Sequence, residues 1–304
     1  MALDPRVLNT AQAVGIPIAL TGAVFLSLGA QFQSRGVKQV ETRASTEAEL
    51  GRSELLRLVR NRSWLFGTVA LGLAIVLQLT SLRFAALIVV QPIGAIALVV
   101  TAILNARMNG VRLHRKVIRA ILLCVLGVGA FVAIAAPNAT DTAISDDDLR
   151  TILVLLAIVL AAFGVLWAVY RARATPIAYI VGAGVLYGFV ATMAKTVINR
   201  LAIGQFDLFT VLSVVGLLAA GLSGFYLVQT AYAVGPPDLV IAGLTVVDPM
   251  VAVGIGVLIL GEAANAEWWA GPAFLVTGAV AVFGVLQLSR HHPEVHARDA
   301  ARAR

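Results

Sequence analysis

The sequence predicts an all-α polytopic membrane helix bundle of about nine transmembrane helices with an inverted structural repeat. Its 304 residues are 60% hydrophobic and 13% charged, whereas soluble domains carry roughly 25% charged residues. Apolar runs recur along the chain at about 20 residues each, the length with which a helix crosses the hydrocarbon core. Only helices and closed barrels satisfy their backbone there, and these runs are too long for barrel strands.

Each expected span is an apolar run that ends at polar or charged residues. In chain order the spans are 12–32, 64–82, 84–106, 117–136, 152–170, 176–195, 208–234, 239–260 and 268–288. The first is predicted to be an uncleaved helix rather than a signal peptide, since its apolar run exceeds signal-peptide length. A tenth crossing would have to pass through 46–62, which is too charged. Leu50, Leu55 and Leu58 among arginines predict that the cytoplasmic loop 34–62 is amphipathic and lies on the membrane surface.

Charge alternates between the loops and predicts the orientation. Most Lys and Arg residues lie in four segments, 34–62, 107–116, 171–173 and the basic tail 290–304, which nine crossings place on one side. The acidic loop 138–149 and Asp207, Glu262 and Glu267 fall on the other side, together with Arg83 and Arg200. By the positive-inside rule, the N-terminus is outside and the C-terminus cytoplasmic in a multi-pass protein of the inner (plasma) membrane. The net charge of +7 follows from this pattern, so we expect no nucleic acid partner.

Small residues predict how the helices pack. Gly15, Gly22 and Gly29 are spaced by seven and share one helix face, and small residues let membrane helices approach closely. A glycine-lined pathway is the alternative reading of that face. The single cysteine, Cys124, lies within an apolar run and is expected to be a buried packing residue.

Two spans resemble each other at a fixed offset. Residues 87–95 read LIVVQPIGA and residues 244–252 read LTVVDPMVA, and each span precedes a glycine-rich one. With nine crossings the two copies run in opposite directions. The sequence therefore predicts two inverted halves, 1–137 and 150–289, with a binding site near the midplane where they meet.

Asp248 is the strongest candidate site residue. It precedes Pro249 in mid-span, and its repeat counterpart is Gln91, which precedes Pro92. A carboxylate at this depth costs about 2.5 kcal/mol or more, and each proline frees a backbone carbonyl. We expect these four residues to form a substrate or coupling-ion site at two broken turns. The alternative is a structural carboxylate held by a neighbouring donor.

Lys195 lies near the expected end of its span, on a face shared with Thr192. It is predicted to bind an anionic group, pair with a carboxylate or snorkel to the headgroups. The further candidates for a polar route are Gln31, Gln33, Gln78 and Gln229, with Tyr187, Tyr226 and Tyr232. Such a residue more often forms an interhelical hydrogen bond than binds a ligand. Glu262, which follows Gly261 at the end of its span, is expected either to have a functional role or to be a solvated carboxylate at the helix end.

No motif of an enzyme is found, so no catalytic residue, cofactor or metal site is expected. The sequence has no Gly-x-Ser-x-Gly, Walker loop or His-Glu-x-x-His pattern. His291, His292 and His296 lie in the basic tail and form at most a loose cluster.

In order along the chain, several motifs resemble one family. The stretch GIPIALTGAVFLSLGA at 15–30 is similar to the first helix of the drug/metabolite transporter (DMT) superfamily, which includes the EamA-like proteins. QPIGA at 91–95 and YGFVATMAK at 187–195 resemble its NIPA-like magnesium transporter branch. The stretch from Asp248-Pro249 to Gly261-Glu262 resembles a helix common to the superfamily. The resemblance implies two inverted repeats around a central cavity.

The sequence thus predicts a secondary transporter that moves a small solute or ion by alternating access. A divalent cation (magnesium) transporter is one alternative, a flippase for a lipid-linked or amphipathic anion is a second, and a non-transporting scaffold is a third. Expected partners are the small-molecule or ion substrate and membrane lipids, and a homodimer is left open.

Overall fold

The computed structural model describes residues 10–41, 60–108, 114–140, 144–170, 175–234 and 237–290. These residues form helices and connecting loops, with no strand among them. The helices are α1 (Thr10–Glu41), α3 (Arg62–Phe84), α4 (Leu87–Gly94), α5 (Ile96–Met108), α6 (Arg115–Asn138), α7 (Asp146–Tyr170), α8 (Pro176–Ala202), α9 (Leu208–Val234), α10 (Pro237–Leu258) and α11 (Ala270–Arg290). Within them, nine segments are long and apolar enough to cross a membrane. The all-α membrane bundle is therefore confirmed.

Several expected bounds are corrected. The helix expected to end at residue 32 continues to Glu41, so part of the expected loop 34–62 is helical, while the amphipathic stretch and the tail fall outside the described residues. Phe84 ends α3 instead of beginning the third span. Asp146 to Asp148 form the first turn of α7 and not a loop. Ser145 and Asp148 exchange hydrogen bonds there, which is a capping arrangement, and acidic residues are favourable at a helix N-terminus.

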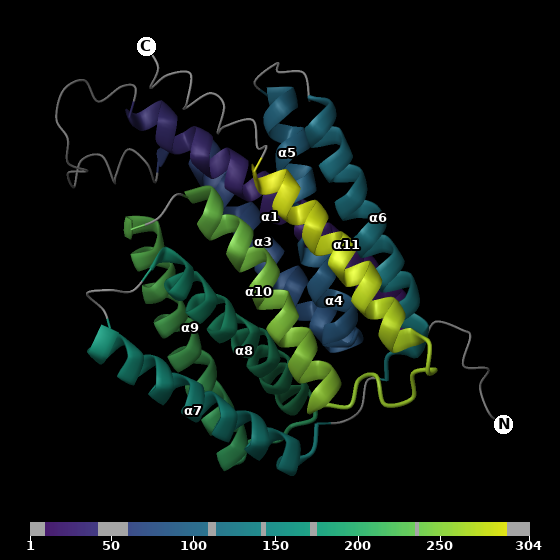
Figure 1. The fold of residues 1–304 in the computed structure, drawn as a ribbon. Coiled ribbons are helices and arrows are strands. Elements are labelled where there is room, and N and C mark those ends of the chain that lie inside the picture. The colour runs from purple at the N-terminus through teal and green to yellow at the C-terminus, as the bar shows by residue number, and fades with distance from the viewer. Residues whose placement is uncertain are drawn as a thin grey trace.

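Helix α8 lies in the middle of the bundle and α7 at its edge. In an apolar stretch of 18 residues of α8, 61% is buried, against 17% in the corresponding stretches of α7 and α11. In Figure 1, α7 and α9 lie on one side of the bundle and α6 and α11 on the other, with α10 between them. The most extensive helix contacts join α1 to α3, α8 to α9 and α6 to α11.

Glycines permit two of these close contacts. A Cβ at Gly29 would fall within 3 Å of Leu71 on α3, and one at Gly15 within 3 Å of Ala85, the residue that follows α3. The predicted glycine face therefore packs against a neighbouring helix. Gly127 of α6 and Gly284 of α11 lie against each other's helix backbone. Cys124 is buried at this second crossing, as expected.

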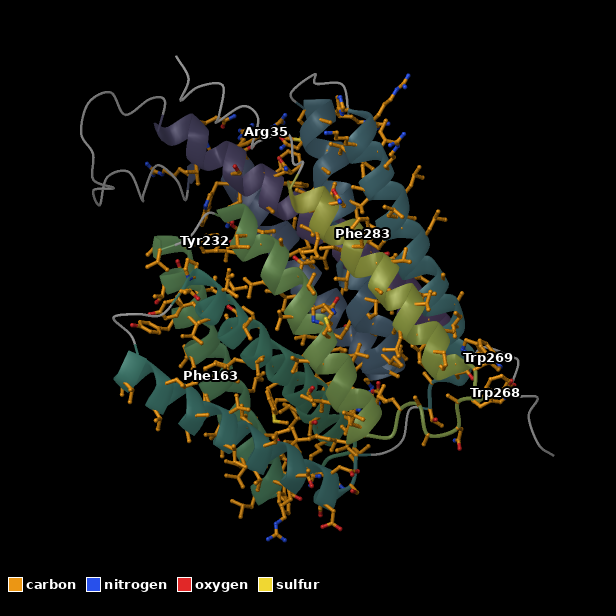
Figure 2. The ribbon with its side chains drawn as sticks, viewed as in Figure 1. Arg35, Phe163, Tyr232, Trp268, Trp269 and Phe283 are labelled. Carbon is orange, nitrogen blue, oxygen red and sulfur yellow. The ribbon has the colours of Figure 1, made fainter. Side chains whose placement is uncertain are left out.

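The two ends of the bundle differ in charge. Asp146, Asp207 and Glu262 lie at one end, which we call the acidic end. There Arg200 near the end of α8 pairs with Asp146 and Asp207. The opposite, basic end carries Arg35, and Figure 2 shows it far from Trp268 and Trp269, which lie just before α11.

Candidate functional site

The first notable group is Glu262, in the loop that follows α10. Gly261 adopts a positive φ of 64°, a conformation that glycine accepts without strain. The turn brings Glu262 back over α10, where its N–H donates to the Gly256 carbonyl at 2.9 Å. Gly256 has no Cβ in the space that the Glu262 carboxylate occupies.

The Glu262 carboxylate accepts three hydrogen bonds in a buried setting. The N–H groups of Leu87 and Ile88 donate to its two oxygens at 2.8 Å each, and the Lys195 ammonium donates at 2.8 Å. The first turn of α4 has free N–H groups and a positive dipole end, which favour a carboxylate. Glu262 is 1% exposed, so the expectation of a solvated carboxylate is wrong. It joins α4, α8 and the loop after α10.

Lys195 does not lie at the end of its helix. Helix α8 continues to Ala202, and the Lys195 side chain is 1% exposed. Lys195 therefore does not snorkel to the headgroups. Of its sequence interpretations, pairing with a carboxylate is confirmed, and the partner is Glu262.

The second notable feature is a cavity of about 390 Å³ near the middle of the spans. Residues from α1, α3, α4, α8 and α10 line it. They include Asp248, Gln91, Gln78, Tyr187, Thr245, Gly94 and Pro249. The Asp248 Oδ1 atom is buried and has no hydrogen-bond partner among the described residues. A buried carboxylate oxygen without a donor is costly, so this atom is available to a ligand.

The third span is broken beside this cavity. Helix α4 ends at Gly94 and α5 begins at Ile96, with the Ala95 N–H donating to the Pro92 carbonyl at 3.1 Å. Proline removes a helix hydrogen bond and glycine has low helix propensity, so together they end α4. The matching break at Pro249 is not observed, because α10 continues from Pro237 to Leu258. That part of the sequence prediction is wrong.

The other polar groups of the cavity have unused hydrogen-bonding capacity. The side-chain amides of Gln78 and Gln91 form no hydrogen bond to any described residue. The Thr245 hydroxyl donates to the Ile241 carbonyl at 2.7 Å and keeps its acceptor lone pairs. Because Pro249 has no N–H, the carbonyl of Thr245, one turn earlier, also lacks its usual helix partner.

Four of the predicted site residues lie outside the cavity. Thr192 is buried and its hydroxyl donates to the Gly188 carbonyl at 3.0 Å. Gln229 is exposed on α9. Pro92 lines a neighbouring apolar pocket of about 110 Å³, and Lys195 is held by Glu262. The cavity therefore brings together Asp248, Gln91, Tyr187 and Pro249 of the predicted set.

Two structural roles were not predicted from the sequence. Thr245 lines the cavity, and its position one helical turn before Pro249 could have indicated this. The contact of Glu262 with the start of α4 has no local signal, because 174 residues separate Glu262 from Ile88.

A polar cluster at the acidic end fixes α7, α8 and α9 to one another. Arg200 is 4% exposed, and it donates to Asp146 at 2.9 Å, to Thr210 at 3.0 Å and to Asp207. The Thr210 N–H donates to Asp207, and this bond, with those from the Thr210 hydroxyl and Arg200, lowers the pKa of Asp207 below its usual value. Arg200 is thus neutralised and does not enter the cavity.

Comparison with known proteins adds a family relationship. The family model described as Magnesium transporter NIPA matches residues 10–203. The chain is also 28% identical over 283 residues to an uncharacterized protein of Corynebacterium glutamicum. The alignment covers 91% of this chain and 95% of that protein. No solved structure matches it.

Proposed function

The chain belongs to the magnesium transporter NIPA family, and from this premise we propose that it carries Mg²⁺ or a similar divalent cation across the membrane. The proposal concerns the substrate and the site. The site is the cavity that Asp248, Gln91, Gln78, Tyr187 and Thr245 line.

The observation that carries the proposal is the charge of this cavity. Asp248 is the one carboxylate among the described lining residues, and none of those residues is Lys, Arg or His. The sequence suggested Lys195 as a residue that binds an anionic group, but its charge is neutralised by Glu262 outside the cavity. A negative cavity with oxygen-bearing side chains favours a cation over an anion.

The donor set fits what is known of magnesium chemistry. Mg²⁺ takes oxygen ligands, keeps several of its waters and is usually bound through one or two carboxylates. Asp248 supplies the carboxylate, and the amide oxygens of Gln78 and Gln91 and the freed carbonyl of Thr245 supply neutral acceptors.

Alternating access requires that each end of the route closes in turn. At the acidic end, Glu262 contacts three separate parts of the chain. These are the start of α4, Thr140 after α6 and the buried Lys195 of α8. We assign this group to the closure of the acidic end, which has to separate when the cavity opens there. The basic residues of the opposite end support a cytoplasmic location for that end, by the positive-inside rule.

The packing also supports two inverted halves. Leu87 at the start of α4 contacts Glu262 just after the end of α10, so the two related spans run antiparallel. Their counterparts Gln91 and Asp248 line one cavity, and the helices that follow them, α6 and α11, cross at glycines. In this scheme α1, α3, α4–α5 and α6 correspond to α8, α9, α10 and α11. Helix α7, which lies within the expected second half 150–289, then belongs to neither set.

Uptake into reconstituted vesicles tests the function. Vesicles that contain the purified protein and a Mg²⁺-sensitive dye should show Mg²⁺ entry that protein-free vesicles lack. Replacing Asp248→Asn should lower the initial rate at least about tenfold, because a lost charged contact costs roughly 1.5–3 kcal/mol.

Asp147→Asn is the matched control, since it removes an exposed carboxylate from the first turn of α7. It should leave the rate unchanged. Uptake of Mg²⁺ by Asp248→Asn at the rate of the unmodified protein would show that the cavity is not the site.

A further inference from the structure

The size of the cavity bears on the form in which a cation binds. Its volume is about 390 Å³, whereas one water molecule takes about 30 Å³ in the liquid. A Mg²⁺ ion with six waters therefore needs roughly 180 Å³. The cavity has room for the hydrated ion.

The lining offers a single carboxylate with which to replace the water shell. Mg²⁺ demands near-octahedral geometry at about 2.0–2.1 Å, but the polar side chains come from four helices, α3, α4, α8 and α10. Among the described residues no group of three or more His, Cys, Asp and Glu side chains is arranged to hold a metal ion. The cavity is not built as a direct coordination cage.

One wall of the cavity offers no oxygen from a side chain. Helix α1 contributes Gly22, Ala23 and Leu26, and the nearby part of α3 contributes Ala74 and Ile75. An ion facing these residues has to keep its waters on that side, because removing them without replacement is costly.

The part of the lining that α4 and α10 supply suits the outer surface of a hydrated cation. The bound waters present hydrogens outward and need acceptors. The buried Oδ1 of Asp248 has no donor among the described residues, and the Gln91 and Thr245 oxygens lie in the same lining. The carboxylate is thus placed to accept hydrogen bonds from polarised water.

From these observations we infer that the cavity binds a fully hydrated divalent cation, with Asp248 contacting the water shell rather than the metal. This inference depends on the proposed function. It predicts that the site recognises an octahedral cation whose ligands donate hydrogen bonds, whatever the metal at the centre.

Hexaamminecobalt(III) is the probe, because its six ammonia ligands do not exchange and leave no position for a carboxylate to bind the metal. It should inhibit Mg²⁺ uptake competitively in the vesicle assay. Isothermal titration of the purified protein should show binding of the complex that weakens at least about tenfold in Asp248→Asn and is retained in Asp147→Asn.

The outcomes separate the two proposals. Mg²⁺ uptake that depends on Asp248 but is insensitive to hexaamminecobalt(III) overturns the hydrated-ion inference and leaves the proposed function standing. Binding of the complex that persists in Asp248→Asn also overturns the inference. Absence of Mg²⁺ uptake by the unmodified protein overturns the proposed function and the inference with it.

Discussion

The ammonium of Lys195 lies 2.8 Å from Oε1 of Glu262, and both side chains are 1% exposed. The same carboxylate receives the N–H groups of Leu87 and Ile88. Burying two charges costs several kcal/mol per ion, and the pair is tolerated only when further hydrogen bonds complete it. Here the N-terminus of α4 supplies them, so the pair and the helix start form one unit.

Lys195→Met should destabilise the protein by about 3–5 kcal/mol, because it leaves the Glu262 carboxylate buried without its cation. Adding Glu262→Gln should recover part of this loss, since the amide oxygen still accepts from the start of α4 and no buried charge remains. Thermal unfolding in detergent, followed by tryptophan fluorescence, measures both effects. A double variant whose loss equals the sum of the two single losses would show that the residues act independently.

Gly127→Ala should destabilise the α6–α11 crossing by roughly 1–3 kcal/mol, the usual cost of overpacking. The added Cβ would meet the backbone of Ala281, which has no room to move aside. Gly129→Ala on the same helix is the control, because its Cβ meets no atom within 4 Å. Unfolding midpoints of the two variants measured side by side check the prediction, and equal midpoints would contradict it.

The positions of the membrane helices were largely predictable from the sequence. A span is a local property, set by the length of an apolar run, and the run 208–234 coincides with α9. The break after Pro92 was also a local signal, although Pro249 alone does not break α10. The difference is physical: Gly94 follows Pro92 and disfavours helix, whereas Met250 and Val251 follow Pro249 and continue it.

The candidate site was predictable only in part. Asp248 and Gln91 stand out because polar groups in apolar spans are costly. The role of Glu262 was not predictable, because its partners Leu87 and Lys195 are distant in the chain. Lys195 was misplaced for a related reason. Ending the span at the lysine put it near the membrane surface, while α8 continues through Arg200, whose charge Asp146 and Asp207 neutralise.

The orientation of the bundle is testable with single cysteines. Cys124 is buried and the sequence has no other cysteine, so Cys124→Ala gives a background without thiols. In that background, Gln205→Cys between α8 and α9 should react with a membrane-impermeant maleimide added to intact cells. Arg107→Cys at the end of α5 should react only after the membrane is permeabilised. The reverse pattern would invert the proposed topology.

The pairing of Asp207 predicts a loss of stability in acid. Hydrogen bonds from Thr210 and Arg200 lower the pKa of Asp207, and the one from the Thr210 N–H has the largest effect. Folding therefore favours the ionised form of Asp207. That contribution is complete above the unfolded pKa of about 3.9 and is lost as pH falls through the lowered folded pKa.

Asp207→Asn keeps a good N-cap but removes the charge. The unfolding midpoint of the unmodified protein should therefore exceed that of Asp207→Asn at pH 7, and the gap should close below about pH 4. Asp147→Asn should not remove this pH dependence, and a gap that stays constant down to the most acidic conditions would exclude the pairing as its cause.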